Sequence, residues 1–191
     1  DRDTSGVMFV AKNQETFLFL KRQFQDRKIK KVYRTIVYGK FKIERGTVDK
    51  PIGRSKSDFR RFAVGGDARG VLREATTEYK VLCSTTNLSK SGAISNKLQY
   101  PCGAKEFSYL EIYPKTGRTH QIRVHLKSIQ HPVVCDKLYA PKKECIFGLE
   151  RTALHAFSVD FFLRDNKRMK LEASLPPDFK QALEQLNLST Q

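Results

Sequence analysis

The sequence predicts an α+β fold with a largely antiparallel sheet. Several short segments are rich in β-branched and aromatic residues, which favours strands, whereas only three segments have the spacing of an amphipathic helix. The connections between them are long and rich in glycine, serine and basic residues. At 191 residues, the chain has the length of one domain, and we expect residues 1–191 to form a single unit that is a fragment of a longer protein.

The first third of the chain predicts two strands around a helix. Residues 7–11 form a short run of strand formers after a polar turn, and residues 32–39 form a second run that ends in a glycine. Between them, Asn13 can cap a helix over about residues 14–25. This helix has an apolar stripe that we expect to pack in the core: Phe17, Leu20 and Phe24.

Residues 54–73 differ from the rest in composition, because arginine, lysine, glycine and serine dominate and large apolar side chains are few. Two interpretations stay open, a mobile basic loop that follows a phosphate backbone and a solvated loop without a role. Beyond it, residues 75–83 and 107–113 predict two further strands. The Ser/Asn/Gly-rich stretch between them, residues 84–103, shows no obvious chemistry.

The segment 115–126 is the centre of the chain, because it holds two arginines, two histidines and a glutamine directly after a strand. We expect a helix from about residue 118 to residue 130, with Lys127 in water. Its apolar stripe faces the core: Ile122, Leu126 and Ile129. Polar side chains on both sides of this stripe are expected at the edge of a cleft: Arg118, Thr119, Gln121, Arg123 and His125.

The C-terminal part predicts one more strand, over residues 154–163, and one more helix. Pro176, Pro177 and Asp178 open this helix. Its apolar residues recur at helical spacing and are expected in the core: Phe179, Leu183 and Leu186.

Composition limits the classes of function. The chain has 36 lysines and arginines against 20 acidic residues, a net charge of +16, which is typical of a nucleic-acid binder. The first 75 residues hold 19 of the basic and 9 of the acidic side chains, so a polyanion would meet this part most strongly. The alternative is a basic protein whose charge only keeps it soluble, or one that binds membrane surfaces. The sequence contains no run of 18 apolar residues, which is the pattern that would predict a membrane-spanning helix.

The four cysteines form no Cys-x-x-Cys pair and have no histidines at zinc-finger spacing, so we predict reduced thiols in a cytoplasmic protein. Cys135 is expected to be a small buried thiol. The histidines at 120, 125 and 131 are not spaced as helical metal ligands, and we predict no metal site.

With these residues identified, the chain resembles an RluA-type pseudouridine synthase. Asp1–Gly6 resembles the end of the family motif His-Arg-Leu-Asp-x-x-Thr-Ser-Gly, although the His-Arg-Leu is absent here. Thr116–Leu126 resembles the family segment Thr-Gly-Arg-Thr-His-Gln-Ile-Arg-Val-His-Leu without a mismatch. Shorter matches occur in the family's order over nearly the whole chain: residues 31–39, 51–54, 131–132, 136–139 and 154–156.

The resemblance implies a pseudouridine-synthase catalytic domain with three catalytic residues. Asp1 is the catalytic aspartate, Tyr33 the active-site tyrosine and Arg123 the arginine that pairs with the aspartate. Asp3 is the competing carboxylate, and Asp1 is preferred because it follows the place of His-Arg-Leu. Leu126 is expected to pack under the uracil. Four residues are expected to hold phosphates or the splayed RNA strand: Arg118, His120, Arg54 and Lys31.

The implied reaction isomerises uridine in structured RNA without a metal or a cofactor. The aspartate suits two routes, as a nucleophile or as a base that gives a glycal intermediate, and the sequence does not choose between them. The resemblance favours ribosomal RNA over transfer RNA as the partner, and we expect a monomer. Three rival functions remain: an inactive RNA-binding module, a metal-free nuclease that uses His120 and His155, and a basic scaffold.

Overall fold

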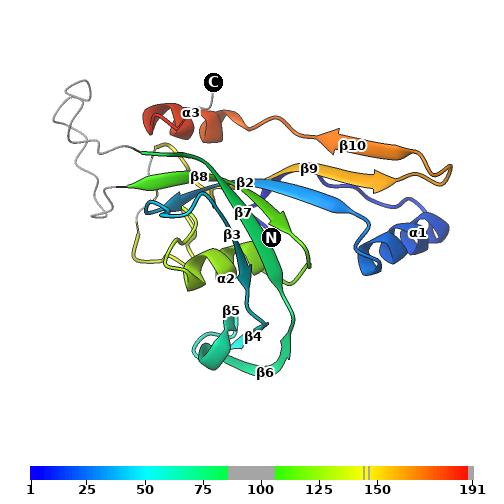
Figure 1. Cartoon of the computed structure of the whole chain (residues 1–191), viewed down its shortest axis with the longest axis horizontal. Helices are drawn as coiled ribbons and strands as arrows, with labels where there is room; N and C mark the ends of the chain where they lie inside the picture. The colour runs from blue at the N-terminus through cyan, green and yellow to red at the C-terminus, as the bar shows by residue number, and fades with distance from the viewer. Residues whose placement is uncertain (86–105, 144, 146, 189–191) are drawn as a thin grey trace.

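A seven-stranded sheet is the main element of the computed structural model, which describes residues 1–85, 106–143, 145 and 147–188 (Figure 1). Its strand order is β1-β9-β2-β8-β7-β3, and β10 pairs with β9 outside this path. The strands are β1 Ser5–Gly6, β2 Lys30–Tyr38, β3 Arg45–Asp49, β7 Thr76–Ser84, β8 Phe107–Pro114, β9 Leu154–Phe162 and β10 Arg168–Glu172. Only the β1–β9 pair is parallel, so the predicted α+β fold with a largely antiparallel sheet is confirmed.

A second, three-stranded sheet with the order β5-β4-β6 projects from the end of β3 and β7 (Figure 1). It consists of β4 Ile52–Ser55, β5 Phe62–Val64 and β6 Ala68–Arg73, with the 3₁₀ turn η1 Gly65–Asp67 between β5 and β6. The prediction of a mobile loop over residues 54–73 was therefore wrong. The few apolar residues of this segment suffice because Val124 and Tyr139, from outside it, complete their cluster.

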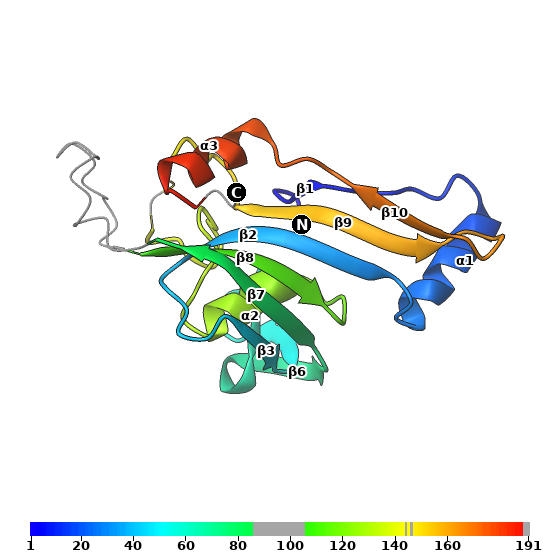
Figure 2. The ribbon, with the colours of Figure 1, turned by 45° about the horizontal axis from the view of Figure 1, so that its top comes forward.

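The first helix, α1 Gln14–Gln25, has the predicted bounds and the predicted cap, since the Asn13 side chain accepts a 2.9 Å hydrogen bond from the Thr16 amide. Its predicted core stripe was right only for Leu20, which packs against a core cluster, and wrong for Phe17 and Phe24, which are 49% and 46% exposed. Figure 2 shows α1 at the far end of the sheet from α3. There, Gln23 is the buried residue, and its amide exchanges two 2.9 Å hydrogen bonds with the backbone of Phe162.

The helices α2 Gln121–Ser128 and α3 Pro177–Gln185 lie on either side of the β2–β8 part of the sheet (Figure 2). The sheet between them is therefore buried on both faces, as the full burial of Ile36 and Val37 shows. The predicted core residues of the last helix are buried as expected: Phe179, Leu183 and Leu186.

Two element boundaries differ from the predictions for backbone reasons. The strand expected over residues 7–11 is absent, and β1 instead precedes it, because Gly6 has a φ of +112° and a Cβ there would lie 2.1 Å from the Ala156 carbonyl oxygen. The helix α2 begins three residues later than predicted, because His120 adopts a left-handed backbone with a φ of 56°. The strands β3 and β10 were not predicted. Most of the stretch 84–103 lies outside the described residues.

The prediction of reduced thiols was wrong for two of the cysteines. Cys135 is buried as expected, but it forms a disulfide with Cys145, with the two Cα atoms 4.6 Å apart. Cys135 itself adopts a left-handed backbone conformation, with a φ of 58°. Cys83 carries a free thiol. In the described part of the chain, no helix is long and apolar enough to cross a membrane.

Candidate active site

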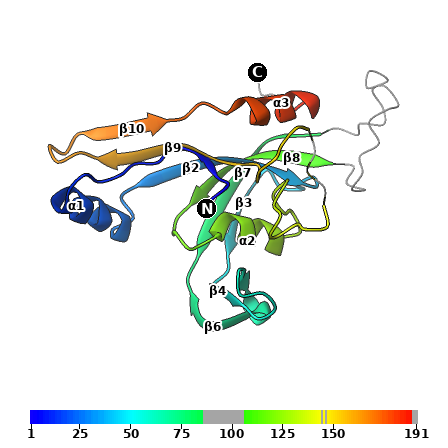
Figure 3. The same ribbon diagram turned by 180° about the vertical axis from the view of Figure 1, so that it is seen from behind.

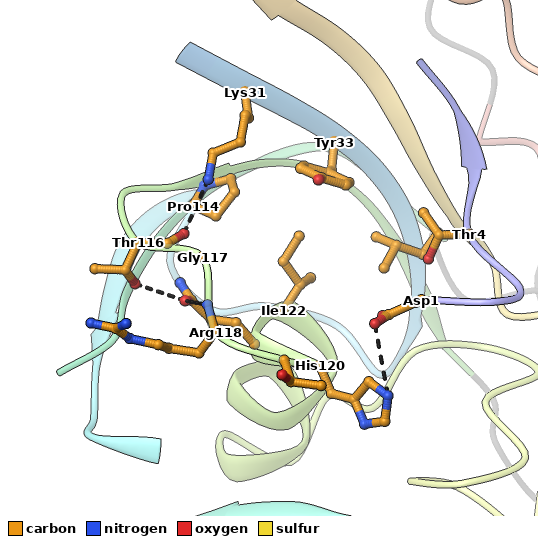
Figure 4. Close-up of a pocket in the computed structure, with 13 residues that line it drawn as sticks. Asp1, Thr4, Lys31, Tyr33, Pro114, Thr116, Gly117, Arg118, His120 and Ile122 are labelled. Atoms are coloured by element: carbon orange, nitrogen blue, oxygen red, sulfur yellow. Dashed lines mark hydrogen bonds and ion pairs between the residues drawn. The ribbon is translucent and has the colours of Figure 1, made fainter. Parts of the chain in front are cut away.

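A cavity of about 370 Å³ opens where the N-terminal segment, β2 and the turn between β8 and α2 meet (Figure 4). The N-terminal residue lies between β9 and α2 (Figure 3), so Asp1 closes one side of this cavity. Its lining includes five of the eight predicted site residues: Asp1, Lys31, Tyr33, Arg118 and His120. Apolar walls come from Pro114, Ile122 and Leu154.

The Asp1 carboxylate lies between two nitrogen-bearing side chains. Its Oδ2 is 3.5 Å from Nη1 of Arg123, and its Oδ1 is 3.7 Å from Nε2 of His120. The N-terminal end of α2 adds a positive field at the same place. Asp3, the competing carboxylate, instead pairs with Arg2 on the surface and does not line the cavity. The structure therefore brings Asp1 and Arg123 together in the predicted arrangement.

The main partner of Arg123 is a residue that the sequence did not reveal. Asp136 accepts hydrogen bonds from Nε and Nη2 of Arg123 at 2.7 and 2.8 Å, and its own side chain is fully buried. Its Oδ1 also accepts the amides of Leu138 and Tyr139 at 3.0 and 2.9 Å. The bidentate pair fixes the plane of the guanidinium, so that the third nitrogen, Nη1, points at Asp1.

A chain of hydrogen bonds determines which nitrogen of His120 carries the proton. The Asp1 carboxylate faces Nε2 and can only accept a hydrogen, so the hydroxyl of Tyr139, which accepts the amide of Phe62 at 2.9 Å, donates its own hydrogen to Nδ1 of His120, also at 2.9 Å. Nδ1 is then the acceptor, and Nε2 carries the hydrogen that faces Asp1. Burial, with the charge of Arg123 as the next cause, lowers the pKa of His120 to about 4, so the ring is neutral at neutral pH.

Tyr33 and Lys31 project from the same face of β2 into the cavity (Figure 4). Burial raises the pKa of Tyr33, so its hydroxyl keeps its proton at neutral pH. Burial lowers the pKa of Lys31, whose Nζ donates to the Thr116 carbonyl at 3.2 Å. The hydroxyl of Thr4, in the same wall as Asp1, is buried and has no hydrogen-bond partner in the described part of the chain.

Gln121 lines the cavity, as expected for a cleft edge, whereas His125 does not; both are buried and hold the turn before α2 in place. The Gln121 carbonyl accepts the hydroxyl of Thr116 at 2.7 Å and the amide of Arg118 at 2.9 Å, while its NH₂ group donates to Thr77. The Thr77 hydroxyl in turn donates to Nδ1 of His125, and Nε2 of His125 donates to the Lys50 carbonyl. Every polar group of this chain is paired, so the turn that carries Arg118 is rigid.

The segment that carries Asp1 is anchored to β9. The Ser5 hydroxyl donates to Nδ1 of His155 at 2.8 Å, because Nε2 of that ring already donates to the Ala173 carbonyl at 3.0 Å. The Val7 amide donates to the Ala156 carbonyl at 2.9 Å. His155 is thereby a structural residue whose two ring nitrogens are both paired with protein groups, which removes the basis for the nuclease hypothesis.

The other predicted binding residues lie outside the first cavity. Arg54 stacks over the Phe62 ring at 4.7 Å and lines a neighbouring cavity of about 360 Å³, which Arg118 also lines. Leu126 is fully buried in the core and does not line the cavity; Ile122 occupies the place that was expected for it. Within the described residues, no group of three or more potential ligands is arranged for a metal ion.

Comparison with known proteins places these features in context. A sequence model of the RNA pseudouridylate synthase family matches residues 1–128. An uncharacterized RNA pseudouridine synthase of Chloroflexus aurantiacus is 35% identical over 97% of this chain and 51% of its own length. The ribosomal large subunit pseudouridine synthase D of Borreliella burgdorferi is 34% identical over 94% of this chain and 48% of its own length. The chain thus spans about half the length of these relatives.

The fold has solved counterparts as well. The human RNA pseudouridylate synthase domain containing 1 is 26% identical, with a TM-score of 0.73, over 95% of this chain and 70% of its own. The human RNA pseudouridylate synthase domain containing 4 has a TM-score of 0.71 over 98% of this chain and 73% of its own. At 24% identity, this likeness supports the fold alone.

Proposed function

Because the chain belongs to the RNA pseudouridylate synthase family, we propose that it isomerises uridine to pseudouridine in RNA, with Asp1 as the catalytic carboxylate. The observation that carries the proposal is the position of this carboxylate, in a half-apolar cavity with Arg123 as its counter-charge and Tyr33 across from it. A ribosomal RNA substrate is favoured because a relative of 34% identity is named for the large ribosomal subunit, and transfer RNA comes second.

The reaction breaks the bond between C1′ and N1 of uridine and forms a bond between C1′ and C5. N1 gains a proton and C5 loses one, so no redox partner is needed. Asp1 acts either as the nucleophile or as the base that removes a sugar proton, and both routes need it ionised and desolvated. Arg123 and the Nε2–H of His120 stabilise this charge at a carboxylate whose side chain is only 19% exposed.

The flipped uracil occupies the apolar part of the cavity, against Ile122, Pro114 and the ring of Tyr33. The protonated hydroxyl of Tyr33 then lies where a proton can be exchanged with the base. The unpaired hydroxyl of Thr4 is available for a polar atom of the nucleotide. These roles use only side chains of one polypeptide, which fits the expected monomer, and a cytoplasmic location remains part of the proposal.

Tritium release from C5 of labelled uridine tests the proposal, with ribosomal and transfer RNA transcripts as substrates. We expect Asp1→Asn to abolish release while RNA binding persists, because phosphate contacts do not use this carboxylate. Asp3→Asn is the matched control, since Asp3 lies two residues away but faces solvent beside Arg2, and it should retain activity. Equal activity of Asp1→Asn and the unmodified chain would eliminate Asp1 as the catalytic residue.

Lack of release from every RNA tested, together with salt-dependent binding, would favour the inactive RNA-binding module instead. The basic side chains around the cavities are the observation that keeps this second function open: Arg54, Arg69, Arg73 and Arg118 in one, and Arg27, Lys31, Lys115 and Arg118 in another.

A further inference from the structure

A second cavity, of about 500 Å³, lies beside the active-site cavity, between the C-terminal end of α1 and the turn that follows β8. The two cavities share part of their lining, namely Lys31 and residues 116–118. The remaining lining consists of Phe24, Gln25, Arg27, Ile29 and Lys115. An extended ligand that fills the first cavity can therefore continue directly into the second.

The shared wall carries a cation without a counter-charge. Lys31 is half-buried, and its Nζ donates to a backbone carbonyl but has no carboxylate partner in the described part of the chain. Arg118 likewise donates to the Glu74 carbonyl at 2.9 Å and has no acidic partner there. The wall stays narrow at Gly117, where a Cβ would lie 3.6 Å from Nζ of Lys31. Half-buried, unpaired cations are the groups that bind a phosphate.

The floor of the second cavity offers an aromatic ring. Phe24 is 46% exposed at the end of α1, and Phe9 covers only part of the ring, at a centroid distance of 6.0 Å. Lys31 holds its Nζ 5.9 Å from the centroid of the same ring. Arg27 follows in a left-handed conformation, with a φ of 55°, and lines the cavity without an ion-pair partner among the described residues. Lys115 is already neutralised by Glu78, at 2.7 Å.

We infer that this second cavity binds the nucleotide next to the target uridine, with its base on the ring of Phe24 and the intervening phosphate at Lys31 and Arg118. The inference rests on the proposed RNA substrate and adds a subsite to it. A stacked base needs a flat apolar face, and a cation beside the ring strengthens the contact. The cavity lined by Arg54 has less of such a face, because the Arg54 guanidinium lies 4.7 Å from the Phe62 centroid, closer than the 5.9 Å between Lys31 and Phe24.

The ring of Phe24 is tolerant of sequence, because every base presents a π-face to it. It therefore contributes affinity and register along the strand rather than recognition of one neighbouring base. Phe24 and Arg27 are binding residues in this arrangement and take no part in the chemistry at Asp1.

The test uses single-stranded RNA oligonucleotides with one uridine and a fluorescent 2-aminopurine on either its 5′ or its 3′ side. Stacking on Phe24 should quench the probe on one side only. Phe24→Leu should remove this quenching and weaken binding by about 5- to 150-fold, the range for loss of one base–aromatic stack. Phe24→Tyr keeps a flat ring and should restore both.

Phe17→Leu is the matched control, because Phe17 is 49% exposed on the same helix but lines none of the cavities described here. Both leucine variants preserve helix propensity, and circular dichroism verifies the fold. The inference is overturned if Phe24→Leu binds like Phe17→Leu, if both probes respond equally, or if the unmodified chain does not bind the oligonucleotides.

The outcome separates this subsite from the proposed function. Loss of stacking in Phe24→Leu without tritium release from any RNA would support the subsite and refute the isomerase. Unchanged binding and unchanged kcat/KM in Phe24→Leu, with normal tritium release, would refute the subsite alone.

Discussion

Asp136→Asn should destabilise the protein strongly, although Asp136 lies outside the active-site cavity. The substitution keeps the size of the side chain and an oxygen for the amides of Leu138 and Tyr139, but it removes the charge that balances Arg123. The Arg123 side chain is only 10% exposed, so its charge would lose its nearest counter-ion in a nearly water-free place. Breaking a buried pair in this way costs about 3–5 kcal/mol.

For a domain of this length, about 1 kcal/mol corresponds to about 2–4 °C in Tm. The expected decrease is therefore about 6–20 °C, measured by circular dichroism during heating, with urea unfolding to verify that the m-value is unchanged. Asp165→Asn serves as the control, since its pair with Lys167 is exposed and should contribute less than about 1 kcal/mol. A loss below about 1 kcal/mol in Asp136→Asn would show that this pair does not hold Arg123 in place.

Three further perturbations follow from the same site. The pKa of His120 is lowered to about 4 from its usual 6.5, so between these values the unfolded chain binds a proton that the folded chain does not. The free energy of unfolding should therefore fall as the pH decreases through this window, and it should fall less steeply in His120→Gln. Urea unfolding between pH 4 and pH 7 measures both. A pH dependence identical in both chains would contradict this. Tyr139→Phe should let the proton move to Nδ1 of His120, which ¹⁵N NMR of the ring reports. Because a lone pair of Nε2 would then face Asp1, the substitution should also lower kcat more than it changes KM. An unchanged tautomer would refute the hydrogen-bond chain. Gly6→Ala places a Cβ 2.1 Å from the Ala156 carbonyl oxygen and should detach the segment that carries Asp1, so activity is lost while far-UV circular dichroism changes little; an active variant would show that this segment does not need β1.

Local patterns were sufficient for the elements that depend on local sequence. The first helix was predicted with its cap because the Asn13 contact spans only three residues, and the last helix because its apolar stripe packs in the core. The first helix packs only one residue of its predicted apolar stripe, Leu20, against a core cluster. Its partner surface at the end of the sheet is small, so a polar residue, Gln23, is buried and Phe24 is left half-exposed.

The residues of the candidate site were likewise predicted only in part. The resemblance named Asp1, Tyr33 and Arg123, and the fold brings these residues to one cavity and its edge, although their catalytic roles stay predictions. Asp136 was missed because its contact with Arg123 depends on a turn after α2 that no periodicity predicts. A signal was present, since an acidic residue in that turn was already part of the matched segment 136–139.

Gln121 and His125 illustrate the limit of reading chemistry from residue type. Both belong to the segment with the densest polar composition, and the hydrogen bonds of both bind the turn to β7 and to the start of the small sheet. A histidine whose two ring nitrogens are already paired with protein groups has no free site for a substrate.

The small sheet leaves the main sheet and returns to it at almost the same point. Asp49 and Thr76 are paired across β3 and β7, a hydrogen bond joins their side chains at 2.9 Å, and the Lys50 amide donates to the Ala75 carbonyl. Everything between residues 50 and 75 is thus a closed excursion, whose length does not affect the register of the strands that position Tyr33 and the turn before α2. An insertion in the exposed 3₁₀ turn η1, at the tip of the small sheet, would leave these contacts in place, whereas a deletion of β5 would remove the Phe62 amide from the Tyr139 hydroxyl. The small sheet can therefore vary in length at its tip, while its base stays tied to the side chains that orient His120.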